Sequence, residues 1–215
     1  MTVDIYIKKC KRNLNDYGFV QTCKKGISYL FSKIYLQKSY CIYRRDLREE
    51  LHPETLPEGI IFKNVGINNT EIIEQIENVE EWLQGQLVSN LTHGLCIAII
   101  DGHDVVGFNL IAFKKAFIPL LNIRKRLSPD QAWSDQITIK KRYRNKGLAI
   151  SLRHHVFEEL YKRGIRRFYG GALTSNIASL KLAQKVGFRP FVNVHYLKIM
   201  NREYHIYRRI KHGIL

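Results

Sequence analysis

Alternating apolar and polar positions predict several strands along the chain. Gly59–Val65 and Gln136–Ile139 alternate as strand residues do. Leu95–Ile100 and Val105–Phe113 are rich in β-branched residues and are joined across Asp101-Gly102, a strong hairpin signal. Further strands are expected at Arg166–Tyr169, Phe188–Ile199 and Tyr204–Ile210.

Three segments have the spacing and the ends of helices. Thr70 to about Leu91 begins with a Thr cap and is dense in Glu. Leu148–Arg163 ends at Gly164, and Ile177–Val186 ends before a Gly, where a C-terminal glycine belongs. The resulting order, β-α-β-β-β-α-β-α-β-β, predicts an α/β fold with a mixed sheet.

The N-terminal segment has a different pattern. Residues 20–38 place apolar side chains at helical spacing with lysines between them, which predicts a basic amphipathic helix. We expect this helix to pack on its own domain, and binding to an anionic membrane surface is the alternative. A short strand at Tyr40–Arg45 and a loop rich in Pro and Glu follow. Residues 1–58 are therefore interpreted as an extension that packs on or covers the core.

Composition excludes several classes of protein. Hydrophobic residues make up 45% of the 215 residues, too many for a disordered chain, and no apolar run is long enough to span a membrane. The N-terminus, MTVDIYIKKCKR, lacks the apolar core of a secretory signal, so a cytoplasmic protein with free thiols is expected. The four cysteines have no metal-binding spacing, and no metal is expected.

Charge is distributed unevenly around a net value of +16. Residues 140–215 contain eighteen basic and three acidic residues, whereas residues 47–139 contain seven and thirteen. A basic C-terminal third beside an acidic middle indicates a site for a polyanion: nucleic acid, an anionic membrane surface or a phosphate-bearing cofactor. For any single Lys or Arg, a solvated surface is the simpler explanation.

The segment from Ile137 to Ala149 combines a strand, a basic loop and the start of a helix. Arg142–Ala149 brings backbone N–H groups to a helix N-terminus, and Gly147 permits close approach. Unpaired donors and the positive end of the helix dipole can hold a phosphate or pyrophosphate. The loop is neither G-x-x-x-x-G-K-[ST] nor G-x-G-x-x-G. It predicts an anion site, with a plain strand-to-helix turn as the alternative.

Arg144–Ala149 (RNKGLA) resembles the R/Q-x-x-G-x-G/A signature of the GNAT acetyltransferase superfamily, and the strand residue Ile139 precedes its Arg by five positions. Asn176–Ser179, 29 residues after the signature glycine, and Leu182–Phe188, which ends in Gly-Phe, resemble the second half of that family. The resemblance covers roughly residues 59–210. It implies a mixed, mostly antiparallel sheet flanked by helices, and an acyltransferase domain at 59–215.

In that family the signature loop binds the pyrophosphate of acyl-coenzyme A, and two parted strands hold the pantetheine arm. The resemblance therefore implies acetyl-CoA as co-substrate. Binding of its phosphates would explain why the C-terminal third of the chain is basic. The loop amides would hold the pyrophosphate, the strand backbone would pair with the pantetheine, and the second motif would meet the pantetheine or acyl end. The expected cofactor-binding residues are Ile137, Thr138, Ile139, Arg144, Asn145, Lys146, Gly147, Leu148, Ala149, Asn176 and Ser179.

The reaction that the resemblance implies is direct attack of an amine on the thioester, which requires a base for the amine proton. Asp135 is the only carboxylate at the fourth predicted strand and is the expected base, directly or through a water. Capping a strand end is its alternative role. With regular alternation, Gln136 and Thr138 would point to the opposite face from Asp135 and contact acceptor or cofactor.

The usual acid of the family is missing. A Tyr commonly lies four residues before the Gly of the terminal Gly-Phe, and Ala183 occupies that position here. Tyr169 and Tyr196 are the substitutes, although a tyrosine on a strand most often serves packing.

The sequence thus predicts an N-acetyltransferase acting on a primary amine of a small molecule. Its acidic middle suits a cationic or amino-bearing acceptor such as a polyamine, amino sugar or amino acid. The apolar segment Lys114–Pro129 either admits a larger acyl chain or acceptor, or covers the core. The alternative function is a basic surface that binds nucleic acid or an anionic membrane, with acetyl transfer weak or lost. No nucleic-acid-binding motif is present, so nucleic acid is not expected. A homodimer remains open.

Overall fold

The computed structural model describes residues 35–47, 59–80, 83–200 and 202–210. The chain divides into two compact units. One comprises Tyr40–Asn193 and Arg208–Leu215, and the other comprises Met1–Ser39 and Val194–Tyr207. No helix in these described ranges is long and apolar enough to cross a membrane.

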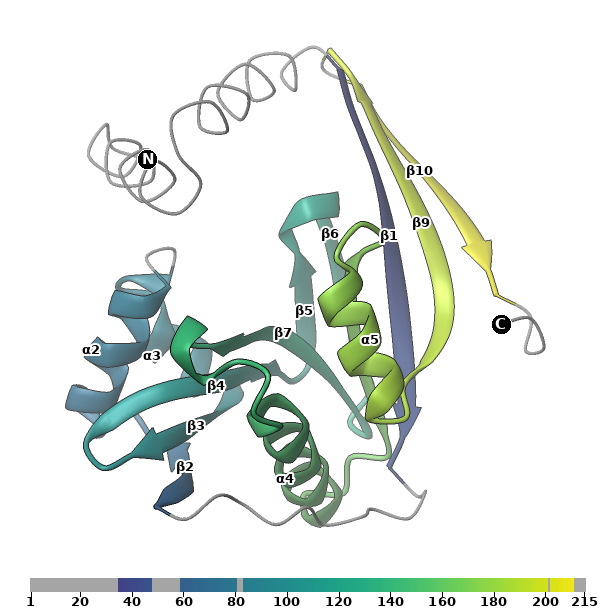
Figure 1. The fold of residues 1–215 in the computed structure, drawn as a ribbon. Helices are drawn as coiled ribbons and strands as arrows, with labels where there is room; N and C mark the ends of the chain where they lie inside the picture. The colour runs from purple at the N-terminus through teal and green to yellow at the C-terminus, as the bar shows by residue number, and fades with distance from the viewer. Residues whose placement is uncertain (1–34, 48–58, 81–82, 201, 211–215) are drawn as a thin grey trace. The chain divides into compact units, whose positions relative to one another are not determined.

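The strands form a mixed, mostly antiparallel sheet in the order β10-β9-β1-β8-β7-β4-β3-β2 (Figure 1). The pairs β1–β8, β2–β3, β3–β4 and β4–β7 are antiparallel, whereas β7 and β8 are parallel. The strands are β1 (Tyr35–Asp46), β2 (Ile60–Val65), β3 (Gly94–Asp101), β4 (Asp104–Ala112), β7 (Gln131–Ile139), β8 (Arg167–Leu173), β9 (Arg189–Ile199) and β10 (Arg202–Arg209). The mixed-sheet prediction is confirmed, and the Asp101-Gly102 hairpin joins β3 to β4.

The N-terminal part of the chain contributes a strand to this sheet. β1 pairs with β8 from Tyr40↔Leu173 to Asp46↔Arg167. The predicted helix at 20–38 lies outside the described residues as far as residue 34. For its last four residues the helix prediction is wrong, because Tyr35–Lys38 belong to the strand β1. Alternation of exposed and less exposed positions, which suits a strand, replaces helical spacing there.

Helices cover both faces of the sheet (Figure 1). α4 (Leu148–Lys162) and α5 (Ile177–Lys185) pack in a core cluster that includes Ile97 and Ile99 of β3. α2 (Thr70–Val79) and α3 (Leu87–Thr92) pack in a second cluster with Cys96 and Ala98, the alternate residues of the same strand. The period of two along β3 thus separates the two apolar layers. As predicted, glycines with positive φ follow α4 and α5: Gly164 (φ 81) and Gly187 (φ 76).

The single helix expected from Thr70 to about Leu91 is instead the pair α2 and α3. Gly85, with φ +69, lies between them, and Glu77 Oε1 accepts hydrogen bonds from the N–H groups of Gly85 and Leu87. Thr70 is not the cap, because the N-cap residue is Asn69. The Asn69 side chain accepts from the Gly66 N–H rather than from the helix.

A small hairpin that the pattern did not predict lies between β4 and β7. Its strands are β5 (Lys115–Ile118) and β6 (Ile123–Arg126), joined by a 3-10 turn over Pro119–Leu121. Each strand has only four residues, too few for a clear alternation. β7 also begins at Gln131, five residues before the predicted start.

Candidate functional site

The strands β7 and β8 part in the middle of the sheet. Their parallel pairing runs only from Gln131↔Arg167 to Trp133↔Tyr169, although the strands continue to Ile139 and Leu173. On its other side β7 stays paired with β4 as far as Ile139. Within the described sheet, β7 therefore has an open edge beyond Trp133, where its main-chain groups lack a strand partner.

The hydrogen-bond ladder shows which groups face this open edge. The Lys140 N–H donates to the Val106 carbonyl over 2.8 Å, which makes Ile139 and Ile137 non-hydrogen-bonded positions of the β4–β7 ladder. Their N–H and C=O groups consequently point away from β4. The Ile139 carbonyl accepts from Arg144 Nε at 2.9 Å. Both groups of Ile137 and the N–H of Ile139 remain for an extended ligand.

A β-bulge interrupts β7 where the open edge begins. Leu110 of β4 pairs with Gln136, and the next residue, Ile111, pairs with Ser134. Asp135 is the extra residue between them and has no partner across the ladder. Bulges of this kind redirect side chains and are frequent beside functional sites.

The bulge changes which side chains share a face. Ser134 Oγ accepts a hydrogen bond from Arg153 of α4 at 2.9 Å, whereas Gln136 Nε2 lies 3.4 Å from Glu80, which follows α2. Two residues this close in a regular strand would point the same way. The bulge therefore sends Ser134 and Gln136 to opposite faces of the sheet.

Asp135 lies on the α2 face with Gln136 and Thr138. The Tyr40 ring stands over Gly171, whose strand neighbours Phe168 and Ala172 pack on the α4 side, so Tyr40 is on the other face. Ser134 points to the α4 face, so the next residue, Asp135, points to the α2 face. Burial raises the pKa of Tyr40, and nearby Tyr43 and Asp135 raise it further. The expectation that Gln136 and Thr138 point away from Asp135 is wrong, because it assumed unbroken alternation.

Burial gives the Asp135 carboxyl unusual acid–base properties. Loss of solvation raises its pKa to about 7. Its Oδ1 is buried and has no hydrogen-bond partner among the described residues. A carboxyl that is half ionised at neutral pH and is not engaged elsewhere suits proton transfer.

Thr138 does not face the open edge. Its hydroxyl donates to Glu80 Oε1 at 3.0 Å and accepts from Gln136 Nε2 at 3.0 Å. The side chains of Glu80, Gln136 and Thr138 thus form a polar cluster on the α2 face, next to Asp135 in sequence.

A buried polar network supports the bulge from the α4 face. Asn109, which is fully buried, donates from Nδ2 to the carbonyls of Gln136 (2.7 Å) and Leu110 (3.1 Å). Its Oδ1 accepts from Arg153 at 2.8 Å. The pattern of the sequence missed this network. The signal was one Asn inside the apolar run VVGFNLIA and one Arg on the buried face of a helix.

Arg153 is a buried cation that aromatic rings and amides surround. Its side chain is 3% exposed, and its guanidinium lies 5.7 Å from the ring centroids of both Phe168 and Phe188. Burial lowers its pKa to about 10, so it stays charged at neutral pH. No ion pair within the described ranges involves Arg153, so Asn109, Ser134 and the rings stabilise its charge.

The loop before α4 presents free main-chain donors. Gly147 is the N-cap residue with φ 79, and Asn145 also has positive φ (62). The helix has no side-chain cap, and no hydrogen bond of the described residues uses the N–H groups of Asn145–Ala149. A Cβ on Gly147 would have no atom within 4 Å, so the space in front of the helix is open. This arrangement can hold an anion.

Other contacts fasten this loop to the β3–β4 hairpin. Arg142 pairs with Asp104 at 2.8 Å, and the Tyr143 hydroxyl donates to Asp101 Oδ2 at 2.6 Å. The Lys146 ammonium lies 5.4 Å from the Tyr143 ring centroid. Of the predicted loop cations, Arg144 is turned back to the strand, which leaves the amides and Lys146 for a ligand.

The second predicted motif forms the start of α5. Asn176 Oδ1 accepts from the Ser179 N–H at 3.1 Å and so caps the helix. Asn176 is exposed and Ser179 is half-buried. Ala183 is the buried residue of α5, with 6% exposure in the core cluster of Phe157 and Phe188. That packing leaves no room for a tyrosine at this position.

The predicted acids occupy different surroundings. Tyr169 lies on the α2 face beside Trp133, and its pairing partner on β1 is Arg44. Tyr196 belongs to the unit Val194–Tyr207, where its ring lies 5.1 Å from that of His205. Tyr40 was not predicted, because its nearness to Asp135 depends on pairing between distant strands.

Among the described residues, no group of three or more His, Cys, Asp or Glu is placed to hold a metal ion.

Comparisons with known proteins agree with this geometry. A family model described as "Acetyltransferase (GNAT) family" matches residues 61–188. A search of curated proteins finds no match. A GCN5-related N-acetyltransferase from Sphaerobacter thermophilus is structurally similar, with TM-score 0.55 and 17% identity over 87% of this chain and 58% of its own. A tandem GNAT protein from the clavulanic acid biosynthesis pathway has TM-score 0.57 and 13% identity over 77% of this chain and 54% of its own. The chain thus spans little more than half of these proteins, and the similarity shows a shared fold.

Proposed function

Because the chain belongs to the acetyltransferase (GNAT) family, we propose that it transfers an acetyl group from acetyl-CoA to the primary amine of a small molecule. The observation that carries this proposal is the open edge of β7. It connects the free amides at the N-terminus of α4 with the buried carboxyl of Asp135 at the bulge.

In this proposal the cofactor follows the open edge. Its pyrophosphate is held by the N–H groups of Asn145–Ala149, with Lys146 close by. Its pantetheine amides pair with the main chain of Ile137 and Ile139, as a short strand would. The thioester then lies where β7 and β8 part. Asn176 and Ser179 at the start of α5 are the further contacts expected for the pantetheine or acyl end.

The reaction needs a proton acceptor and a proton donor. Asp135 takes a proton from the acceptor's ammonium group, the amine nitrogen forms a bond to the thioester carbon, and the carbon–sulfur bond breaks. The nitrogen then releases its second proton to solvent, which leaves a neutral amide, and the departing thiolate takes a proton from a donor that solvent reprotonates. Tyr40 is the first candidate donor, because its ring lies on the α2 face with Asp135 and its phenol is protonated at neutral pH. Tyr169 is the second candidate, and Tyr196 is the third.

Turnover tests the proposed function directly. Thiol release from acetyl-CoA is measured with primary amines of different charge, and the acetylated product is identified by mass. Amine-dependent release of free CoA, with a mass gain of one acetyl group on the amine, is expected. Folded protein that binds acetyl-CoA but acetylates no amine would contradict it. The membrane-binding alternative depends mainly on residues 1–34, which lie outside the described ranges.

A further inference from the structure

A row of aromatic and cationic side chains crosses the α2 face of the sheet beside Asp135. Trp133 of β7 pairs with Tyr169 of β8, and Tyr169 pairs with Arg44 of β1. Phe191 of β9 completes the row, with its ring centroid 6.0 Å from that of Tyr169. Trp133 is two residues before Asp135 on the same strand, so the row begins roughly 7 Å from the proposed base. Each further member of the row lies on a strand about 5 Å further across the sheet.

Three cations in this row have no acidic partner among the residues that the structure describes. Arg44 and Arg209 lie over the Phe191 ring, at 5.3 and 5.9 Å from its centroid, and Lys125 of β6 lies 5.7 Å from that of Tyr169. None of the three makes an ion pair with any carboxylate of the described residues.

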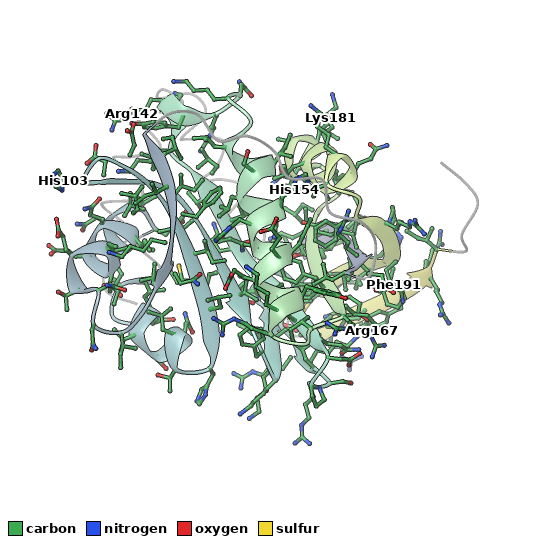
Figure 2. All side chains as sticks on the ribbon, turned by 90° about the horizontal axis from the view of Figure 1, so that it is seen from below. His103, Arg142, His154, Arg167, Lys181 and Phe191 are labelled. Atoms are coloured by element: carbon green, nitrogen blue, oxygen red, sulfur yellow. The ribbon has the colours of Figure 1, made fainter. Side chains whose placement is uncertain are left out.

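The charge of another arginine near the row is neutralised by an acidic partner. Arg167 binds Asp130 with two nitrogens at 2.8 to 3.1 Å. Figure 2 shows Arg167 and Phe191 on one side of the molecule, well apart from Arg142 in the loop before α4. The row is therefore separate from the proposed pyrophosphate site.

Charge changes sign along this face of β7. Glu80 is bound to Thr138, Asp135 follows at the bulge, and the unpaired cations begin at the level of Trp133. A ligand lying along the strand would thus have carboxylates at one end and cations on aromatic rings at the other. Such a gradient favours a molecule that carries both charges.

We infer that the acceptor is a zwitterion: a small primary amine that carries a carboxylate or phosphate at its other end. This inference rests on the proposed function. The ammonium group lies at Asp135, and the acidic group is bound by Lys125 and Arg44, with Arg209 behind them. Guanidinium and ammonium donors suit either kind of acid. The acidic middle of the sequence suggested a cationic acceptor, but the charges placed next to the site favour the zwitterion.

Matched acceptors test the inference by thiol release. 5-Aminopentanoate is compared with 5-aminopentanamide, and 3-aminopropyl phosphate with 3-amino-1-propanol, so that each pair differs in the acidic group. We expect kcat/KM to be at least about tenfold higher for the acidic member of one pair. The pair that shows this preference tells whether the site binds a carboxylate or a phosphate. Equal values within both pairs would overturn the inference and leave the proposed acetyl transfer intact.

A substitution at Lys125 provides a second test of the inference. Lys125→Met should remove most of the preference for the acidic acceptor, so that kcat/KM falls more for the acidic member than for its neutral partner. Arg124→Met is the matched control, because Arg124 is the preceding residue of β6 and lies over Phe117 instead, 5.4 Å from its centroid. A preference that survives in Lys125→Met would contradict the assigned position.

Binding separates failure of this inference from failure of the proposed function. If no amine is acetylated, titration calorimetry with 5-aminopentanoate and 3-aminopropyl phosphate still measures whether the cations of the row bind an anion. Binding of either that weakens at least about fivefold in Lys125→Met, and not in Arg124→Met, supports an anion site. Absence of binding by both probes to the folded wild-type protein overturns it.

Discussion

The side-chain amide of Asn109 lies 2.7 Å from the carbonyl of Gln136, and this hydrogen bond supports the bulge that contains Asp135. Asn109 is in turn fixed by Arg153 at 2.8 Å. The position of the proposed base thus depends on a buried network on the opposite face of the sheet. A fully hydrogen-bonded network of this kind fixes one arrangement of the strand.

Asn109→Leu should weaken this support. We expect kcat to fall at least about tenfold while acetyl-CoA affinity falls less than kcat does, since the pyrophosphate contacts at Asn145–Ala149 lie beyond β7. The free energy of unfolding should fall by roughly 1–3 kcal/mol, because Arg153 loses a buried acceptor. Asn64→Leu is the control, as its bond to Glu159 is exposed. A positioning role also predicts a shifted acidic limb of the pH–rate profile, and an unchanged profile would argue for a purely structural role.

Asp135→Asn should remove the base. Turnover is expected to fall about 10²- to 10⁴-fold, with acetyl-CoA binding nearly unchanged, because the amide cannot accept the ammonium proton. In the wild type, kcat/KM should decline as the pH falls below about 7, where the carboxyl becomes protonated. Glu74→Gln, an exposed change on α2, serves as the control. Near-normal turnover of Asp135→Asn at neutral pH would exclude Asp135 as the base.

The same substitution should stabilise the fold at neutral pH. The pKa of Asp135 is raised from 3.8 to about 7, so the folded chain holds an extra proton between these values and the wild type loses stability as the pH rises through them. Asp135→Asn avoids this loss. We expect its free energy of unfolding to exceed that of the wild type by roughly 1–3 kcal/mol at pH 8 and to match it near pH 4. Urea titrations at both pH values measure the difference, and equal stability at pH 8 would refute the burial argument.

Gly147→Val should abolish acetyl-CoA binding. Its branched side chain would fill the open space before α4, and the positive φ of 79 adds strain. Gly164→Val is a matched control, because Gly164 has φ 81 and equally open surroundings at the other end of α4. Calorimetry should show lost binding only in Gly147→Val, with similar unfolding midpoints for both variants. Equal affinity in the two would mean that the loop does not hold the cofactor.

Tyr40→Phe and Tyr169→Phe distinguish the two candidate acids in the same unit. Loss of the donor should lower kcat about tenfold or more in Tyr40→Phe, with a smaller effect in Tyr169→Phe, because the Tyr40 phenol interacts with Asp135. The basic limb of the pH–rate profile should change with Tyr40→Phe alone. The reverse order of effects would transfer the role to Tyr169.

Local chemistry made part of this structure predictable. The Asp101-Gly102 turn and the strand–glycine loop–helix at Arg144–Ala149 are each specified by a few adjacent residues, and both formed as expected. The bulge at Asp135 could not be predicted in this way, because it depends on the register of β4 and on Asn109, 26 positions earlier. Tyr40 approaches Asp135 only because β1 inserts beside β8, a pairing between segments more than 120 residues apart.

The central claim is that the open edge of β7 and the N-terminus of α4 form one acyl-coenzyme A site. Titration calorimetry of the wild-type protein with acetyl-CoA, with free CoA and ATP for comparison, tests it most directly. We predict saturable binding of one acetyl-CoA per chain, with CoA bound similarly and ATP much more weakly. Well-folded protein that binds no acetyl-CoA would contradict the claim.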